Sequence, residues 1–221
     1  MSCHTKLDDG FHPHLTMGAR FEGEMGIPSL LDLGNACVPQ DIVPFEKVGQ
    51  IPVAQRHNVY VHFYMHDNRF AQILYNTDAC LSKLEGFGGI ITPDFTILEG
   101  QSQCLQATNT YFNRAVGFYA QIHGVPVIPG IRWGEPSTYG FCFLGVPEGG
   151  ILSISTHGCM KSNRDKESFR NGLEEMIRCL FPTDVLVHGK MPPSVFDEFE
   201  SRTNFHRYPS WFERAHEKKG A

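Results

Sequence analysis

The chain has 221 residues, 41% of them hydrophobic and 19% charged, and its formal net charge is -5. These proportions exclude a disordered or coiled-coil protein and predict a folded domain with a full core. The net negative charge argues against non-specific binding to duplex DNA, so nucleic acid is expected to bind through a local patch only. No stretch approaches the roughly 18 apolar residues of a membrane span, so no membrane contact is expected.

Seven cysteines are scattered along the chain, and none forms a CxxC pair. A chain of this length does not need disulfides to fold, which favours a reduced, cytoplasmic protein. A zinc site near the N-terminus is one hypothesis, although its spacing matches no standard finger, and a tail without a site is the alternative. Its ligands would be Cys3, His4, His12 and His14 together with Cys37.

The N-terminal part, residues 1–57, is rich in Gly, Pro, His and charged residues and has no long helical period. We predict an irregular extension that packs on the core. Residues 58–205 alternate short apolar runs with amphipathic stretches, which predicts one α/β domain. Residues 206–221 are predicted to form a polar C-terminal tail.

Apolar, β-branched runs within the domain predict five strands, at 58–65, 88–95, 125–131, 151–158 and 184–189. Helices are predicted at 68–87, 101–124 and 165–181, with a short helix or turn at 136–146 and a short helix at 194–202. Because the strands are nearly continuous apolar runs, the sheet is expected to be parallel and covered on both faces. The expected architecture is a mainly parallel sheet of about five strands with flanking helices, Rossmann-like, with a partial or distorted β/α barrel as the alternative.

Polar side chains follow every predicted strand. In parallel α/β proteins, ligands bind beyond the carboxyl ends of the strands, so these residues are expected to share one rim. Turns are polar in most proteins, and each residue alone has a structural explanation, but their convergence predicts a functional site. The residues are His66, Asp67, Asp94, Arg132, Trp133, Glu135, Thr156, His157, Cys159, His188 and Lys190.

Three of these residues are the candidate catalytic groups. Asp94, Glu135 and His157 carry the carboxylates and the imidazole that general acid–base chemistry uses. Arg132 has the planar fork that holds a phosphate or a carboxylate, and Trp133 has a ring that can stack on a base or a sugar.

The remaining rim residues suggest further roles. His188 is a candidate substrate contact, and Cys159 is either a nucleophile or a small buried residue. A divalent metal is a possible cofactor, because imidazole and carboxylate groups bind zinc, manganese or iron. Its predicted ligands are His66 and Asp67, with Asp94, His157 and His188 as further candidates.

The helix predicted at 101–124 carries three polar residues, Asn109, Asn113 and Arg114. Arg114 is a candidate to hold a substrate anion with Arg132, and the two asparagines are candidate substrate contacts. Because Asn is only a modest helix former, this face is expected to hydrogen-bond something, for which the loop after Asp94 is one candidate. Packing of the helix end is the alternative.

Aromatic residues near the C-terminus, Tyr208, Trp211 and Phe212, suggest a docking segment. The segment could bind a second copy of the chain in a homodimer or fold back on its own domain.

Four stretches resemble one family: ITPDFT, NTYFNRAVGFYAQIHGVPVIPGIRWGE, FCFLGVPEGGILSISTHG and GLEEMI. They resemble the domain of unknown function DUF4417, found in bacteria, their phages and mobile elements, and the resemblance covers roughly 22–189. The motif positions that it carries over are Pro93, Asp94, Asn109, Asn113, Arg114, Pro129, Trp133, Phe141, Phe143 and Gly158.

With the rim residues, the resemblance suggests a phage- or mobile-element-associated enzyme. It would act on a phosphorylated or nucleotide-like small molecule, or on a nucleic-acid end, with Asp94 as general base or metal ligand. The alternative is a non-catalytic binding module, such as a ligand-sequestering or DNA-element accessory protein. The absence of a nucleophile motif such as GxSxG argues against an enzyme.

Overall fold

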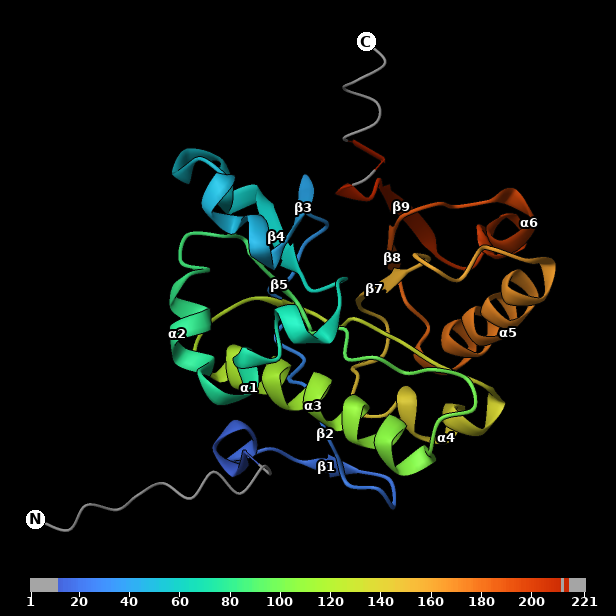
Figure 1. Cartoon of the computed structure of the whole chain (residues 1–221), viewed down its shortest axis with the longest axis horizontal. Helices are drawn as coiled ribbons and strands as arrows, with labels where there is room; N and C mark the ends of the chain where they lie inside the picture. Colours follow the sequence, from blue (N-terminus) through green and yellow to red (C-terminus); the bar gives the residue numbers. More distant parts are fainter. Residues whose placement is uncertain (1–11, 212, 215–221) are drawn as a thin grey trace, which may run out of the picture.

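The fold is given by a computed structural model of the chain, which describes residues 12–211, 213 and 214. The main strands in these residues form two parallel sheets flanked by helices (Figure 1). The predicted α/β class with mainly parallel strands is therefore confirmed. The larger sheet contains β3 (Asp41–Pro44), β4 (Val59–His62), β5 (Gly89–Ile91) and β6 (Val127–Ile128), and the smaller contains β7 (Ile151–Ser155), β8 (Asp184–His188) and β9 (Asn204–Tyr208). A short antiparallel pair precedes them, β1 (Phe21–Glu22) with β2 (Ile27–Pro28).

Two long helices, α3 (Gln103–Ile122) and α5 (Asn163–Leu180), match the helices predicted at 101–124 and 165–181. Helix α5 begins with a capping box, in which the Ser162 hydroxyl accepts the backbone N–H of Asp165. The shorter helices are α1 (Gln72–Tyr75), α2 (Thr77–Ser82), α4 (Tyr139–Cys142) and α6 (Pro193–Phe196). Turns of 3-10 helix lie at Pro13–Thr16, Phe45–Gln50, Val53–Asn58, Asp67–Arg69, Pro136–Thr138 and Asp197–Phe199.

The helix predicted at 68–87 is interrupted. Asn76 has φ −130° and ψ 48°, outside the helical region, and it separates α1 from α2. The hydroxyl of Thr77 donates to the carbonyl of Ile73 at 2.6 Å and satisfies part of the broken helix end. The apolar period correctly predicted helical structure here, but at the break a side-chain hydrogen bond takes the place of continuous backbone hydrogen bonding.

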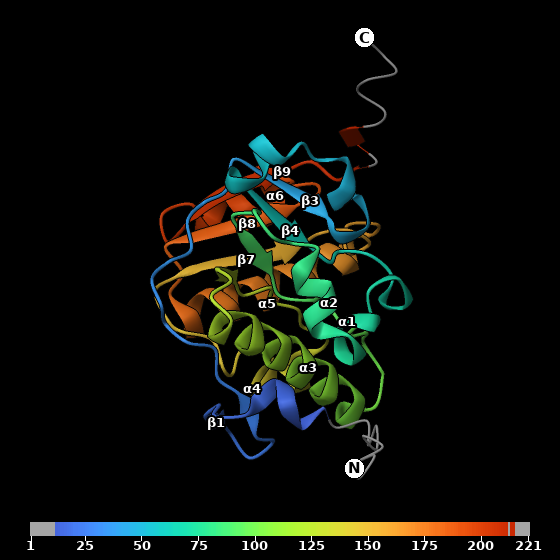
Figure 2. The same cartoon turned by 90° about the vertical axis from the view of Figure 1, so that its left-hand side faces the viewer.

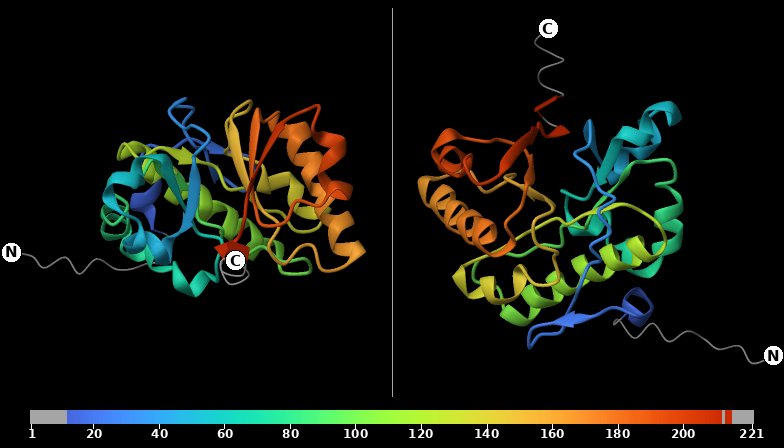
Figure 3. Two further views of the ribbon diagram at one scale, coloured as in Figure 1. Left: turned by 90° about the horizontal axis from the view of Figure 1, so that it is seen from above. Right: turned by 180° about the vertical axis from the view of Figure 1, so that it is seen from behind.

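The order of the parallel strands follows the chain from β3 to β9 without a reversal. One parallel bridge, between Gly130 and Ser153, joins the larger sheet to the smaller one. A doubly wound sheet reverses its strand order at a switch point, whereas a β/α barrel does not. The arrangement is therefore that of the partial or distorted barrel. Seen from above, α5 and α6 flank the outer side of the smaller sheet (Figure 3).

Side chains alternate between the inside and the outside of this arc of strands. On β7, Leu152 and Ile154 pack in the apolar cluster that includes α5, whereas Ser153 and Ser155 belong to the other face. Helices α1, α2 and α3 cover the outer face of the larger sheet (Figure 2). The inner face has its own apolar cluster, contributed by six strands: Ile42, Tyr60, Ile91, Ile128, Leu186 and Tyr208.

The ends of the described chain contribute two strands that the sequence did not predict. β3 lies within residues 1–57, although it pairs with β4 along its whole length, and β9 crosses the limit drawn at 205. The C-terminal segment folds back on the start of β3, where Arg214 binds both carboxylate oxygens of Asp41 at 2.7 and 2.6 Å.

Of the C-terminal aromatics, Tyr208 is buried in its own chain, where its hydroxyl donates to the carbonyl of Pro39 at 2.6 Å. Trp211 is 39% exposed, and Phe212 lies outside the described residues. Docking on the chain's own domain therefore accounts for Tyr208.

Candidate functional site

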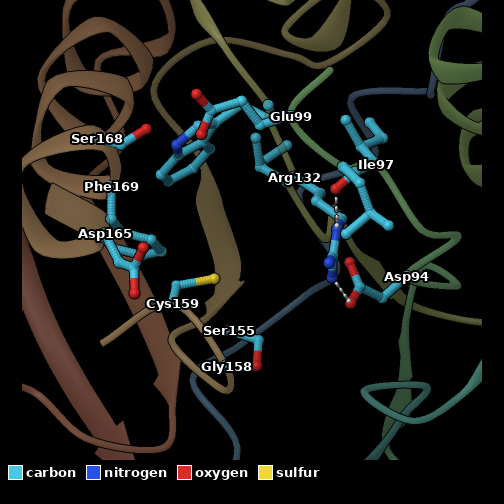
Figure 4. A pocket seen from close by; sticks show the side chains of 14 residues that line it. Asp94, Ile97, Glu99, Arg132, Ser155, Gly158, Cys159, Asp165, Ser168 and Phe169 are labelled. Carbon is cyan, nitrogen blue, oxygen red and sulfur yellow. Dashed lines mark hydrogen bonds and ion pairs between the residues drawn. The ribbon is translucent and has the colours of Figure 1, made fainter. Parts of the chain in front are cut away.

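A cavity of about 180 Å³ opens at the carboxyl edge of β5, β6 and β7, where the sequence predicts a rim (Figure 4). We call it the rim pocket. The β5–α3 loop, the segment after β6, the β7–α5 loop and the first turns of α5 form its walls. Its lining residues are Asp94, Ile97, Leu98, Glu99, Ile131, Arg132, Trp133, Gly134, Ser155, Gly158, Cys159, Asp165, Ser168 and Phe169.

An ion pair between Asp94 and Arg132 lies on one side of the rim pocket (Figure 4). Arg132 Nη1 donates to Asp94 Oδ2 at 2.7 Å, and Arg132 Nε donates to the carbonyl of Ile97 at 3.2 Å. Burial raises the pKa of the Asp94 carboxyl, and the guanidinium opposes that rise, while the carboxylate raises the pKa of Arg132. The pair is therefore a fixed, largely desolvated dipole beside the cavity.

Two asparagines of α3 hold the loop that carries Asp94. Asn113 Nδ2 donates to the carbonyl of Pro93 at 2.8 Å, and Asn109 Nδ2 donates to the carbonyl of Thr96 at 2.5 Å. The expectation that this helix face binds the loop after Asp94 is confirmed. These asparagines are absent from the pocket lining and act on Asp94 through the backbone.

Arg114 lies inside the fold, away from the pocket lining, and is 1% exposed. It donates to the backbone carbonyls of Leu144 at 3.0 Å, Cys142 at 2.8 Å and Gly130 at 3.3 Å. Burial lowers the pKa of its guanidinium to about 10. Because these carbonyls occupy its fork, Arg114 joins α3 to α4 instead of facing a substrate anion.

Trp133 forms an aromatic wall with Phe169 of α5, with ring centroids 4.9 Å apart. The indole lies against the backbone of α5 at Gly172, where an added Cβ would be 2.0 Å from Trp133 Nε1. The glycine in the middle of a helix is therefore explained by the close approach of the ring.

A second group of polar residues lies on the inner face of the strands, at their carboxyl ends. Ser155 Oγ is 3.0 Å from His188 Nδ1, and Tyr64 Oη is 2.7 Å from Ser153 Oγ. The His188 ring stacks on Tyr64 at 4.9 Å and contacts His62 at 4.7 Å. We call these five residues the inner polar cluster; it meets the rim pocket at Ser155.

Both histidines of the inner polar cluster have depressed pKa values. Burial, the largest cause, lowers the pKa of His188 to about 4 and that of His62 well below 6.5. They are neutral at neutral pH. Of these residues, the sequence predicted His188 but not His62, Tyr64, Ser153 or Ser155. Their signal was a polar residue at every second position of strands that are otherwise apolar.

Two predicted catalytic residues lie outside the pocket lining. Glu135 is partly exposed, and its carboxylate accepts the backbone N–H of Gly100 at 3.3 Å and the amide of Gln106 at 3.4 Å. Hydrogen bonds, first that of its own backbone N–H, lower its pKa. His157 is exposed, and its backbone N–H donates to Ser155 Oγ at 3.3 Å. Both residues therefore support loops of the pocket.

The described residues contain no group of three or more His, Cys, Asp or Glu side chains placed to hold a metal ion. Of the predicted ligands, His66 is exposed, and both carboxylate oxygens of Asp67 accept from Thr96, at 3.1 Å from its N–H and 2.7 Å from its hydroxyl. Of the proposed zinc ligands, Cys3 and His4 lie outside the described residues. Geometry thus gives the divalent metal no support in the described part of the chain.

The cysteines among the described residues are all free thiols. Burial raises the pKa of Cys159 in the pocket lining, which keeps it protonated and argues against a thiolate nucleophile.

Each charged side chain of the pocket lining has a partner. Besides the Asp94–Arg132 pair, Glu99 binds Arg164 at 2.8 Å, and Asp165 accepts the backbone N–H of Ser162 at 3.0 Å. The lining therefore contains three carboxylates and one guanidinium that is already neutralised.

The molecule is an α/β protein of barrel-like strand order, with a pocket at the carboxyl edge of its strands. It belongs to the DUF4417 family, a domain of unknown function whose model matches residues 19–209, and the predicted resemblance is confirmed. Within the described residues, no helix combines the length and apolar character that crossing a membrane requires.

Curated relatives come from phages. The chain is similar to the Gene 1 protein of Mycobacterium phage L5, with 35% identity over 131 residues, 59% of this chain and 57% of the relative. It is 33% identical to the Gene 1 protein of Mycobacterium phage D29 over 131 residues, 59% of this chain and 48% of that protein. The chain thus spans about half the length of these relatives. No solved structure matches it. The predicted phage association is confirmed by these relatives.

Proposed function

We propose that this phage-associated protein is an enzyme that binds a small, planar, nucleoside-like compound in the rim pocket. The observation that carries the proposal is the Asp94–Arg132 pair, with a buried carboxylate, beside a wall made by Trp133 and Phe169. An aromatic wall binds the face of a flat ring, and a fixed donor–acceptor pair binds its polar edge.

Charge favours the base and sugar over a phosphate as the bound group. Arg132 is the only cation among the described residues that line the pocket, and it is already paired. A phosphate would lie near the carboxylates of Glu99 and Asp165 and would need a free cation or open helix N–H groups. We therefore expect a ligand that is neutral, or that donates a hydrogen bond from the edge that faces the Asp94 carboxylate.

Asp94 is the group assigned to proton transfer. Burial raises the pKa of this carboxyl, which makes its carboxylate a stronger base than that of an exposed aspartate. Arg132 orients the carboxylate from one side and leaves the other oxygen for the ligand.

The test is a comparison of common nucleosides with their monophosphates by thermal shift and calorimetry. Nucleosides at about 100 times their dissociation constant should add about 2.7 kcal/mol of stability, and the monophosphates should bind less tightly. Asp94→Asn should weaken nucleoside binding at least tenfold. The matched control is Asp184→Asn, because Asp184 also has an ion-pair partner, His206 at 2.7 Å, but lies at the amino end of β8.

Two results would contradict the proposal: monophosphates that bind at least as tightly as nucleosides, or an Asp94→Asn variant that binds like the wild type. A non-catalytic binding module is the second candidate, favoured by the protonated thiol of Cys159, which removes one nucleophile. Incubation with the bound nucleoside, followed by chromatography for products, distinguishes an enzyme from a binding module.

A further inference from the structure

The inner polar cluster contains a hydroxyl and an imidazole that the proposed ligand site does not use. Ser155 ends β7 and lines the rim pocket, and His188 ends the neighbouring strand β8. The two are paired in register, so the strands themselves bring Ser155 Oγ to 3.0 Å from His188 Nδ1. A nucleophile within hydrogen-bond distance of a base, beside a cavity, is the arrangement that covalent catalysis requires.

From this arrangement we propose that Ser155 is a nucleophile, with His188 as its general base, that hydrolyses a neutral ester in the rim pocket. The inference uses the same cavity as the proposed function, but it does not depend on a nucleoside as the ligand.

The hydrogen bonds around Ser155 fit this direction of proton transfer. The backbone N–H of His157 donates to Ser155 Oγ at 3.3 Å, which leaves the hydroxyl proton free to point at His188 Nδ1. Burial lowers the pKa of His188 to about 4, so the ring is neutral at neutral pH and its Nδ1 can accept the hydrogen bond from the hydroxyl of Ser155. The rings of Tyr64 and His62 contact the imidazole and fix its orientation.

The reaction balances without a further reactant except water. Ser155 Oγ forms a bond to the acyl carbon as its proton passes to His188 Nδ1, and the bond from that carbon to the leaving oxygen breaks. The leaving alkoxide takes the proton from His188. Water then attacks the acyl-enzyme, gives its proton to His188 and releases the acid, while Ser155 Oγ recovers the proton.

The cavity lining favours an uncharged acyl group. Three lining carboxylates disfavour an anionic substrate, and apolar side chains such as Ile97, Ile131 and Phe169 surround the remaining space. A small neutral ester fits this chemistry better than a phosphate ester.

The test is covalent labelling of the full chain with a small neutral dialkyl fluorophosphate, followed by intact mass and peptide mapping. The serine oxygen forms a bond to phosphorus, fluoride leaves, and the proton passes to the histidine. We expect a single dialkyl phosphoryl group on Ser155 in the wild type. Its formation should fall at least 100-fold in His188→Gln, since a positioned general base contributes about 10² to 10⁴ in rate.

Ser82→Ala is the control, because Ser82 lies on α2, outside the rim pocket and the inner polar cluster, and its hydroxyl donates to the carbonyl of Asp78 at 2.8 Å. Ser82→Ala should be labelled like the wild type, and Ser155→Ala should not be labelled. Peptide mapping distinguishes a label on Ser155 from one on the neighbouring thiol of Cys159.

The inference is overturned if the folded wild type remains unlabelled, if Ser155→Ala is labelled as fast, or if His188→Gln does not slow the labelling. Nucleoside binding and labelling, both measured on the wild type, separate the two proposals. If the wild type binds nucleoside but is not labelled, only the serine chemistry is wrong. If it is labelled but binds no nucleoside, only the proposed ligand is wrong.

Discussion

Replacing Gly172 by alanine tests the aromatic wall of the rim pocket. A Cβ at this position would lie 2.0 Å from Trp133 Nε1 and 2.3 Å from Trp133 Cδ1, so the indole must move. Alanine in a helix interior gains about 1 kcal/mol over glycine, and overpacking costs about 1–3 kcal/mol. We therefore expect the free energy of unfolding to fall by up to about 2 kcal/mol and the displaced indole ring to turn into the cavity.

The assay is urea unfolding, read with Trp133 fluorescence in a Trp211→Phe background. Nucleoside binding should fall at least tenfold because the ring occupies the ligand's place. Gly140→Ala is the matched control, since Gly140 also lies in a helix, α4, and its added Cβ would meet no atom within 4 Å. The control should gain up to about 1 kcal/mol and keep its binding. If Gly172→Ala gains as much stability as Gly140→Ala and the Trp133 fluorescence is unchanged, Trp133 does not pack on α5.

Three further predictions concern the groups that support the site. Arg114→Leu should lower the free energy of unfolding in urea by about 3 kcal/mol, because it leaves buried carbonyls without donors. Arg114→Lys should not recover this stability, because lysine lacks the planar guanidinium that donates to several carbonyls at once. Tyr208→Phe should lose about 1 kcal/mol, since its hydroxyl bonds to the carbonyl of Pro39; no loss would mean that this bond does not stabilise the fold. The His188 pKa is depressed on folding, to about 4 from about 6.5, so the unfolded state binds more protons and stability falls as pH drops through this window. Between pH 7 and pH 5, the free energy of unfolding of the wild type should fall by about 2 kcal/mol more than that of His188→Gln. An equal fall in the two proteins would contradict a buried neutral ring.

How far the sequence could predict the fold depended on how local each signal is. The alternation of apolar runs and amphipathic stretches located β4 to β8, α3 and α5, because each has a period within its own residues. β3 and β9 carry charged or polar residues, such as Asp41, His206 and Arg207, and their burial comes from partners elsewhere in the chain. The choice between an open sheet and a barrel depends on which strands become neighbours, and a period along one strand does not contain that information.

The candidate site shows the same division. The rule that ligands bind beyond parallel strand ends led to Asp94, Arg132 and Trp133, which the structure brings together in one lining. Their neighbours in sequence behave differently: Glu135 holds a loop, and His157 is exposed. A residue's place after a strand fixes the edge at which it lies, but rotation of the loop decides whether its side chain enters the pocket.

The inner face of the strands changes character along its length, and this change explains why chemistry collects at one edge. Its middle is apolar, with Tyr60 and Leu186 among the buried residues, whereas one step further along the same strands stand His62 and His188. Buried imidazoles and hydroxyls weaken a fold unless they find partners, and these rings find them mainly in each other and in Ser155. An apolar residue at each position would satisfy packing alone. The polar residues therefore mark the part of the barrel interior where the sequence departs from what stability requires, which is the signature expected of a functional site.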